Sequence, residues 1–275
     1  MNKNIIDNFS KLNRSLFFLP LVFLLIIVFF LYSQNALNVA QYVQIQKSYF
    51  ILINSKLSQF PTLIYNLTQI GDALIFLSIL TVFFINAPKM WEALISASLV
   101  SLILSRALKS IFSVPRPAEI LDHHSFVIVG KTLKGFSSLP SGHSITIFTV
   151  LTVLLYALMP EKLPKKIFWT LLLFFIGITL ISTRVGLGAH YPLDVITGSA
   201  IGYFCGLSGI FISRKYKIWN WIALKKYYPF FIALFLVCSI IIIIKIINEN
   251  LIIFYFPLAG LIFSLFKITQ EYVKK

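Results

Sequence analysis

The chain has 275 residues, of which 58% are hydrophobic and only 12% are charged, and its mean hydropathy is +0.88. Soluble domains carry roughly 25% charged residues, so this composition excludes an ordinary soluble protein and indicates an integral membrane protein. The formal net charge is +15, but no nucleic-acid-binding motif accompanies it, and basic residues in short loops are typical of loops that face anionic lipid. We therefore expect the lipid bilayer, and no nucleic acid, as a partner.

The predicted membrane spans follow from apolar runs, since a spanning helix needs about 20 mostly apolar residues. Residues 16–32 form the first run, which we interpret as an uncleaved span because no small-residue cleavage site follows closely. Residues 33–59 form a polar connection, for which a helix on the membrane surface is one interpretation. The remaining runs predict spans at residues 70–85, 92–108, 141–159, 167–182, 192–213, 229–247 and 251–266.

The last two runs are separated by only three residues, 248–250, which predicts a tight helical hairpin. The final run is short for a span and contains Pro257, so a tilted, thinned or partly re-entrant segment is an alternative. The whole pattern predicts an all-α polytopic membrane protein with about eight transmembrane helices. We expect six spans within residues 1–213, followed by a basic linker and the hairpin within residues 214–275.

The distribution of lysine and arginine predicts the orientation of the spans. These residues gather near the N-terminus, in the loops after the even-numbered spans and at the C-terminus. Cytoplasmic loops carry an excess of such residues, so both termini are expected in the cytoplasm. The loops after the third and fifth spans are then expected to face the periplasm or the cell exterior.

Three polar clusters stand at the ends of consecutive spans, and the predicted orientation places all three on the outer side. They are KSIFSVPRP with Lys109 and Arg116, PSGH with Ser141, Gly142 and His143, and STRVGLGAHYPLD with Arg184, His190 and Asp194.

The residue types in these clusters indicate phosphoryl transfer. One lysine and two arginines supply positive charge, and arginine can hold phosphate oxygens through two parallel hydrogen bonds. Ser141 follows a proline where a helix N-cap is expected, so the free N–H groups of Gly142 and His143 would point at an anion. We predict no metal site, because no cluster of carboxylates suited to magnesium is present.

Two histidines provide one group to attack phosphorus and one to protonate a leaving group. Asp194 follows His190 by four residues, about one helical turn, and Pro192 between them suits a helix start. A carboxylate at this spacing can hold the imidazole in one tautomer and stabilise its cation, as in a serine-protease triad.

The three clusters together resemble the signature of the type 2 phosphatidic acid phosphatase (PAP2) superfamily. That signature is Lys-x6-Arg-Pro, then Pro-Ser-Gly-His, then Ser-Arg-x5-His-x3-Asp. Thr183 stands where the signature has serine, and threonine keeps the hydroxyl. The resemblance extends over roughly residues 71–213 and leaves the C-terminal hairpin outside.

The resemblance implies a six-helix catalytic membrane domain and a role for each motif residue. His190 would be the nucleophile that forms a phosphohistidine, His143 would protonate the leaving group, and Asp194 would orient His190. No metal or other cofactor would be needed. The phosphoryl group would be held by Lys109, Arg116, Ser141, Gly142 and Arg184.

We therefore expect a hydrolase that removes phosphate from a membrane lipid phosphate or diphosphate at the outer face of the membrane. Related enzymes act on undecaprenyl diphosphate, phosphatidylglycerophosphate, phosphatidate and lipid A, and the sequence does not choose among these lipids. A lipid-to-lipid phosphotransferase with the same residues is an alternative, and a non-catalytic transporter or scaffold is another. Size and architecture suggest a bacterial inner membrane, whereas the oligomeric state stays open.

Other polar residues have ordinary structural interpretations. His123 and His124 are expected to be solvated loop residues, with contact to a lipid head group or a proton relay as the alternative. Asp72 is expected to cap the helix that follows it, and Arg106 to reach the membrane interface. Three glycines spaced by four residues predict close packing of the sixth span inside the bundle, with a dimer contact as the alternative. They are Gly198, Gly202 and Gly206.

Overall fold

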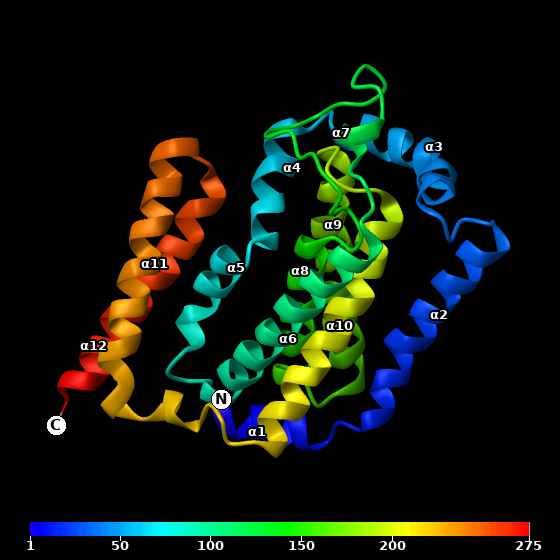
Figure 1. The fold of residues 1–275 in the computed structure, drawn as a ribbon. Coiled ribbons are helices and arrows are strands. Elements are labelled where there is room, and N and C mark those ends of the chain that lie inside the picture. The colour runs from blue at the N-terminus through cyan, green and yellow to red at the C-terminus, as the bar shows by residue number, and fades with distance from the viewer. Residues whose placement is uncertain (275) are drawn as a thin grey trace.

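The computed structural model describes residues 1–274, which fold into a bundle of α-helices with no β-strand in that range (Figure 1). The helices are α1 (Asn2–Ser10), α2 (Phe18–Ser33), α3 (Val39–Leu57), α4 (Pro61–Thr68), α5 (Ala73–Leu80), α6 (Pro88–Phe112), α7 (Pro117–Ile120), α8 (Gly142–Ala157), α9 (Leu163–Gly186), α10 (Pro192–Lys215), α11 (Tyr228–Glu249) and α12 (Tyr255–Val273).

The predicted all-α membrane fold is confirmed, and a helix lies at each of the eight predicted spans. Within residues 1–274, six helical segments are long and apolar enough to cross a membrane. They are Arg14–Ser33, Pro88–Ile120, Leu163–Gly186, Pro192–Lys215, Lys225–Glu249 and Ile252–Val273. Helix α8 is apolar but has only 16 residues, and the remaining span is broken into α4 and α5.

The second predicted span differs from its prediction at its beginning. The sequence places its start at residue 70, but the helical segment begins at Pro61 and bends by 76° between Gly71 and Ala73. The bend follows from Asp72, whose extended backbone and side-chain hydrogen bond to the Leu74 N–H make it the N-cap of α5. The capping role predicted for Asp72 is therefore confirmed, but it restarts a helix instead of starting the span.

The final segment is longer than its apolar run predicts. Pro257 lies in the first turn of α12, where a proline removes no intrahelical hydrogen bond. The helix then continues to Val273, so Ile252–Val273 provides 22 residues in place of the predicted 16. Because Asn250 adopts a left-handed conformation at the end of α11, the chain reverses there and forms the predicted hairpin.

Helix α10 packs closely against α8, and glycine makes this approach possible. A Cβ atom on Gly202 would lie 2.5 Å from the Ile145 carbonyl oxygen, and one on Gly198 would lie 2.7 Å from the Ser141 carbonyl oxygen. The predicted packing role of these glycines inside the bundle is confirmed. As a result, the N-terminal ends of α8 and α10 lie side by side, and the Ser141 N–H donates to the Asp194 carbonyl oxygen at 3.1 Å.

Helix α3, within the polar connection after the first span, is fastened to loops at one end of the bundle. The Asn54 amide donates to the carbonyl oxygens of Val127 and Gly186, each at 2.9 Å, and accepts from the Val127 N–H at 2.8 Å. Gln46 accepts from the Leu193 N–H at 2.7 Å. These bonds hold α3 against the segments that carry the third polar cluster.

The two chain termini lie at the opposite end of the bundle from α3 and α7 (Figure 1). At the terminal end, the Asn8 amide donates to the carbonyl oxygens of Ala157 and Met159, and Arg214 donates to the Leu12 carbonyl oxygen. The basic linker between α10 and α11 runs along the same end. The segments that the charge pattern assigns to one side therefore share one end of the molecule.

Candidate active site

The carboxylate of Asp194 accepts three hydrogen bonds within the site. It lies in the first turn of α10, and none of its surface is exposed. Its Oδ2 atom accepts from the Ser138 hydroxyl at 2.6 Å and from the Tyr191 N–H at 2.9 Å, and its Oδ1 atom accepts from the Tyr42 hydroxyl at 2.7 Å. Three donors from three segments therefore fix the carboxylate in position.

His190 lies directly in front of this carboxylate and is 1% exposed. Its Nδ1 atom is 3.5 Å from Asp194 Oδ2, and its Nε2 atom is 3.4 Å from Arg116 Nη1. Because a guanidinium can only donate, Nε2 must be the accepting, unprotonated nitrogen, which leaves the proton on Nδ1 facing the carboxylate. The Nε2 lone pair therefore points toward the guanidinium group of Arg116.

The electrostatic surroundings keep this imidazole neutral. Burial lowers the pKa of His190 well below its usual value, and the positive charges of Arg116, Arg184 and Lys109 lower the pKa further. Of these three cations, Arg116 is the one in direct contact with the ring. A neutral imidazole is the form that a nucleophilic histidine needs, so the surroundings of His190 are compatible with that role.

Arg116 connects the first and third polar clusters. It is the residue before α7, and its Nε atom donates to the Ser137 hydroxyl at 3.4 Å. Its Nη1 atom donates to the Ala189 carbonyl oxygen at 3.2 Å. These bonds hold the guanidinium beside the His190 ring.

Arg184 is the most deeply buried cation of the three. It lies in the last turn of α9, is 5% exposed, and donates from Nη1 to the Thr68 hydroxyl at 2.8 Å. Its Nε atom is buried and has no hydrogen-bond partner among residues 1–274. A buried donor without a partner costs about 1–3 kcal/mol, so an anion bound here would remove that cost.

The N-terminus of α8 provides the remaining part of the site. Ser141 is the N-cap, as predicted, and its hydroxyl accepts from the Ser144 N–H at 3.4 Å. A Cβ atom on Gly142 would lie 3.3 Å from Lys109 Nζ, so the ammonium group lies against this glycine. The positive end of the helix dipole and a lysine thus meet at one point, which favours an anion.

His143 follows in the first turn of α8, and its ring packs against the break between α4 and α5. A Cβ atom on Gly71 would lie 2.5 Å from the His143 Cδ2 atom, so only glycine fits there. Beside the ring is a groove of about 440 Å³ between α5, α6 and α8. Aliphatic side chains and small hydroxyl groups line it, including Leu77, Leu99, Leu102, Ser98, Ser101 and Ser105.

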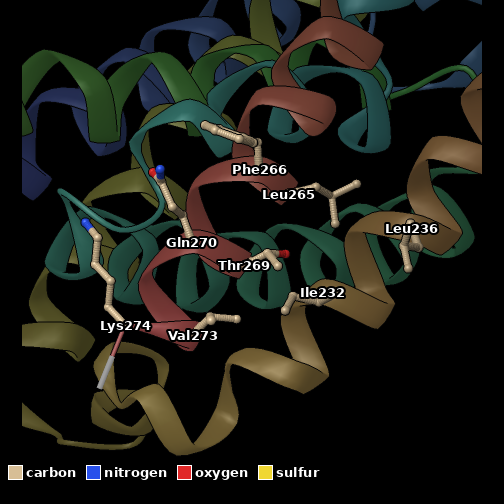
Figure 2. Close-up of a pocket in the computed structure, with 8 residues that line it drawn as sticks. All are labelled: Ile232, Leu236, Leu265, Phe266, Thr269, Gln270, Val273 and Lys274. Carbon is tan, nitrogen blue, oxygen red and sulfur yellow. The ribbon is translucent and has the colours of Figure 1, made fainter.

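A second groove, of about 820 Å³, lies between α11 and α12 (Figure 2). Its lining side chains come from α11, α12 and the residue that follows α12, and most of them are apolar. They are Ile232, Leu236, Leu265, Phe266, Thr269, Gln270, Val273 and Lys274. This groove is separate from the polar clusters.

The structure brings all eight motif residues to one end of the bundle, and it adds residues that sequence reasoning missed. Tyr42 and Ser138 bond Asp194, and Thr68 bonds Arg184. Ser138 had a weak signal, since it stands two residues before the PSGH cluster, whereas Tyr42 and Thr68 had none. His123 and His124 lie in the loop after α7, where the His123 ring contacts the Ala118 carbonyl oxygen.

Comparisons with known proteins agree with the motif arrangement. The family model described as the PAP2 superfamily matches residues 90–221. The chain is similar to the crystal structure of LpxE from Aquifex aeolicus, with 31% sequence identity and a TM-score of 0.50. The match covers 62% of this chain and 96% of that chain. The chain belongs to the PAP2 superfamily. A search of curated proteins gave no match.

The PAP2 match includes every residue of the three clusters and ends before α11 begins. Membership in this superfamily, together with the likeness to LpxE, supports a lipid phosphatase. The hairpin of α11 and α12 lies outside the region that the PAP2 model matches.

Proposed function

We propose that the protein is a metal-independent phosphatase that removes phosphate from a membrane lipid phosphate or diphosphate through a phosphohistidine at His190. The observation that carries the proposal is the position of His190. Its Nε2 atom is 3.4 Å from Arg116 Nη1, its Nδ1 atom is 3.5 Å from Asp194 Oδ2, and Arg184 and Lys109 are near enough to lower its pKa. This arrangement suits an attack on an electrophile that carries negative charge.

In the first step, His190 Nε2 attacks phosphorus, and the bond between phosphorus and the leaving oxygen breaks. His143 enters this step as the imidazolium and becomes neutral when it gives a proton to that oxygen, while Arg116 and Arg184 hold the phosphoryl oxygens. In the second step, His143 removes a proton from water, and the resulting hydroxide attacks phosphorus. The P–N bond then breaks, which releases inorganic phosphate and restores neutral His190.

The groove beside His143 supports a lipid as the substrate. It opens between α5, α6 and α8 and is lined mainly by apolar side chains. One end of its lining is formed by Gly142 and His143, the first two residues of α8, where we expect the phosphate to bind. A phosphate at the N-terminus of α8 would thus have space for an attached apolar chain along the same helix. Candidate substrates are phosphatidate, phosphatidylglycerophosphate, undecaprenyl diphosphate and the phosphates of lipid A.

The test is phosphate release by the purified protein in detergent, with these four lipids compared at equal surface concentration. We expect release from at least one lipid, full activity in EDTA because cations of the chain neutralise the phosphate, and inhibition by vanadate, which resembles five-coordinate phosphorus. Activity lost in EDTA and restored by magnesium would contradict the metal-independent reaction. Transfer of phosphate to a second lipid without release of inorganic phosphate would show a phosphotransferase instead.

We further propose that both termini are cytoplasmic and that the site faces the outer side of a bacterial inner membrane. The common location of the basic segments and the termini at one end of the bundle supports this orientation. It predicts that a cysteine at Asn250, in a chain with Cys205 and Cys238 replaced by alanine, reacts with an impermeant maleimide added outside. A cysteine at Lys217 is the matched control and should stay unlabelled, and labelling of Asn250 only from the cytoplasmic side would contradict the orientation.

A further inference from the structure

Lys245 is a charged residue that the catalytic motifs do not explain. It interrupts a run of isoleucines in α11, outside the region that the PAP2 model matches. A lysine within a membrane span is costly unless it pairs with another group. Its Nζ atom lies 3.4 Å from Asp72 Oδ2, and the two side chains are 32% and 35% exposed.

Asp72 is the residue at which the second span breaks. Its Oδ1 atom caps α5 by accepting from the Leu74 N–H at 2.9 Å, while its Oδ2 atom faces Lys245. One carboxylate therefore both starts α5 and connects the break to α11. The two halves of the span meet at 76°, and Asp72 lies at their junction.

The same break forms one wall of the proposed active site. Gly71, the neighbour of Asp72, packs so closely on the His143 ring that a Cβ atom would lie 2.5 Å from Cδ2 and 2.7 Å from the ring-bearing Cβ. Gly71 and Ala73 also line the groove beside His143. A movement of the break would therefore move the surface on which the His143 ring rests.

Other contacts fasten the hairpin to both halves of the broken span. On the α4 side, Glu249 accepts from the Tyr65 hydroxyl at 3.3 Å, and the Ile253 N–H donates to Asn66 at 3.1 Å. On the α5 side, a Cβ atom on Gly260 would lie 2.8 Å from the Ser78 carbonyl oxygen. The hairpin is thus held on both sides of Asp72.

We propose that the Lys245–Asp72 pair makes the C-terminal hairpin a positioning element for His143. The pair holds the α4–α5 break at one angle, and Gly71 transmits that position to the His143 ring. Lys245 and Asp72 are positioning residues, because they act through the break and touch neither the substrate nor the reacting atoms. The inference rests on the proposed function, since it assumes that His143 protonates the leaving group.

The test uses two substrates that differ in their need for a proton. An alkyl phosphate leaves as an alcohol and needs the proton, whereas p-nitrophenyl phosphate leaves as a stable anion and needs it much less. We measure kcat/KM, which reports on the steps up to the transfer to His190. The variants are Lys245→Met and Asp72→Asn, because methionine keeps an unbranched side chain and asparagine keeps the N-cap of α5.

Each variant is expected to lose about tenfold in kcat/KM with the alkyl phosphate, as a small displacement of a proton donor does, and less than twofold with p-nitrophenyl phosphate. The double variant should lose no more than either single variant, because both remove the same interaction. Lys267→Met is the matched control, since Lys267 lies in α12 over the Phe263 ring. It should leave both substrates unaffected.

Equal losses with the two substrates, or no loss with either, would overturn the positioning role while leaving the phosphatase reaction intact. If Lys245→Met fails to fold, Asp72→Asn alone decides, because it keeps the cap and removes only the charge. Wild-type protein that hydrolyses neither substrate and no lipid phosphate would overturn the proposed function, and with it the role of the pair.

Discussion

His190→Ala is expected to lower kcat by a factor of about 10⁴ or more, because it removes the atom that bonds to phosphorus. The loss should appear in kcat, since Arg116, Arg184 and Lys109 remain to bind the phosphate. The imidazole is also buried between Asp194 and Arg116, so its removal leaves a small cavity. The measurement is single-turnover phosphate release, with the thermal unfolding midpoint recorded for the same sample.

Two comparisons separate a nucleophile from a structural residue. His124→Ala removes an exposed histidine of the loop after α7 and should keep near-normal kcat. Asp194→Asn should cost less than His190→Ala, because it leaves the nucleophile in place, although an amide cannot accept from all three donors that surround the carboxylate. A folded His190→Ala protein with kcat within tenfold of the wild type would refute the proposed nucleophile.

Arg184→Met is expected to lower kcat/KM by a factor of about 10²–10³, which is the range for removing one fixed donor from a site where charge develops. The reason is that Arg184 is buried, and its Nε–H has no partner in the described part of the chain, so it is available to a phosphate oxygen. Arg184→Lys should recover part of the loss, because a lysine restores the charge without the two parallel donors.

The matched control for Arg184 is Arg106→Met. Arg106 is an exposed residue of α6 outside the three clusters, and its replacement should change kcat/KM by less than twofold. If Arg184→Met folds and keeps kcat/KM within a factor of about three, Arg184 does not hold the phosphoryl group. That result would require a different explanation for its buried, unbonded nitrogen.

The positions of the helices were predictable because each span is an apolar run with polar ends, and hydropathy reports this property directly. The break at Asp72 was not predictable in the same way. Gly71 and Asp72 stand at a polar-to-apolar transition, which also fits a simple helix start, and only the structure shows that a helix already precedes Asp72 and that its cap starts a second one. Pro257 was misleading because its effect depends on whether it lies in the first turn of a helix.

The site was predictable to the extent that its residues occur in short motifs. His190 and Asp194 are only four residues apart, and their side chains come within 3.5 Å of each other across Tyr191, the N-cap of α10. His190 lies before the helix, however, and not, as the spacing predicted, one helical turn away along it. Tyr42 is 152 residues from Asp194, and its hydroxyl reaches the carboxylate only because α3 is held on the loops by Asn54 and Gln46. Sequence spacing has no means of showing such a tertiary contact. The same limit applies to Lys245, whose partner Asp72 lies 173 residues away.

The stereochemical course at phosphorus tests the phosphohistidine most directly. A phosphorothioate ester carrying ¹⁶O and ¹⁸O in known configuration would be hydrolysed in ¹⁷O water, and the configuration of the released thiophosphate determined. Two successive in-line displacements, first by His190 and then by water, predict retention of configuration. Inversion would show a single displacement by water, which would contradict a covalent intermediate on His190.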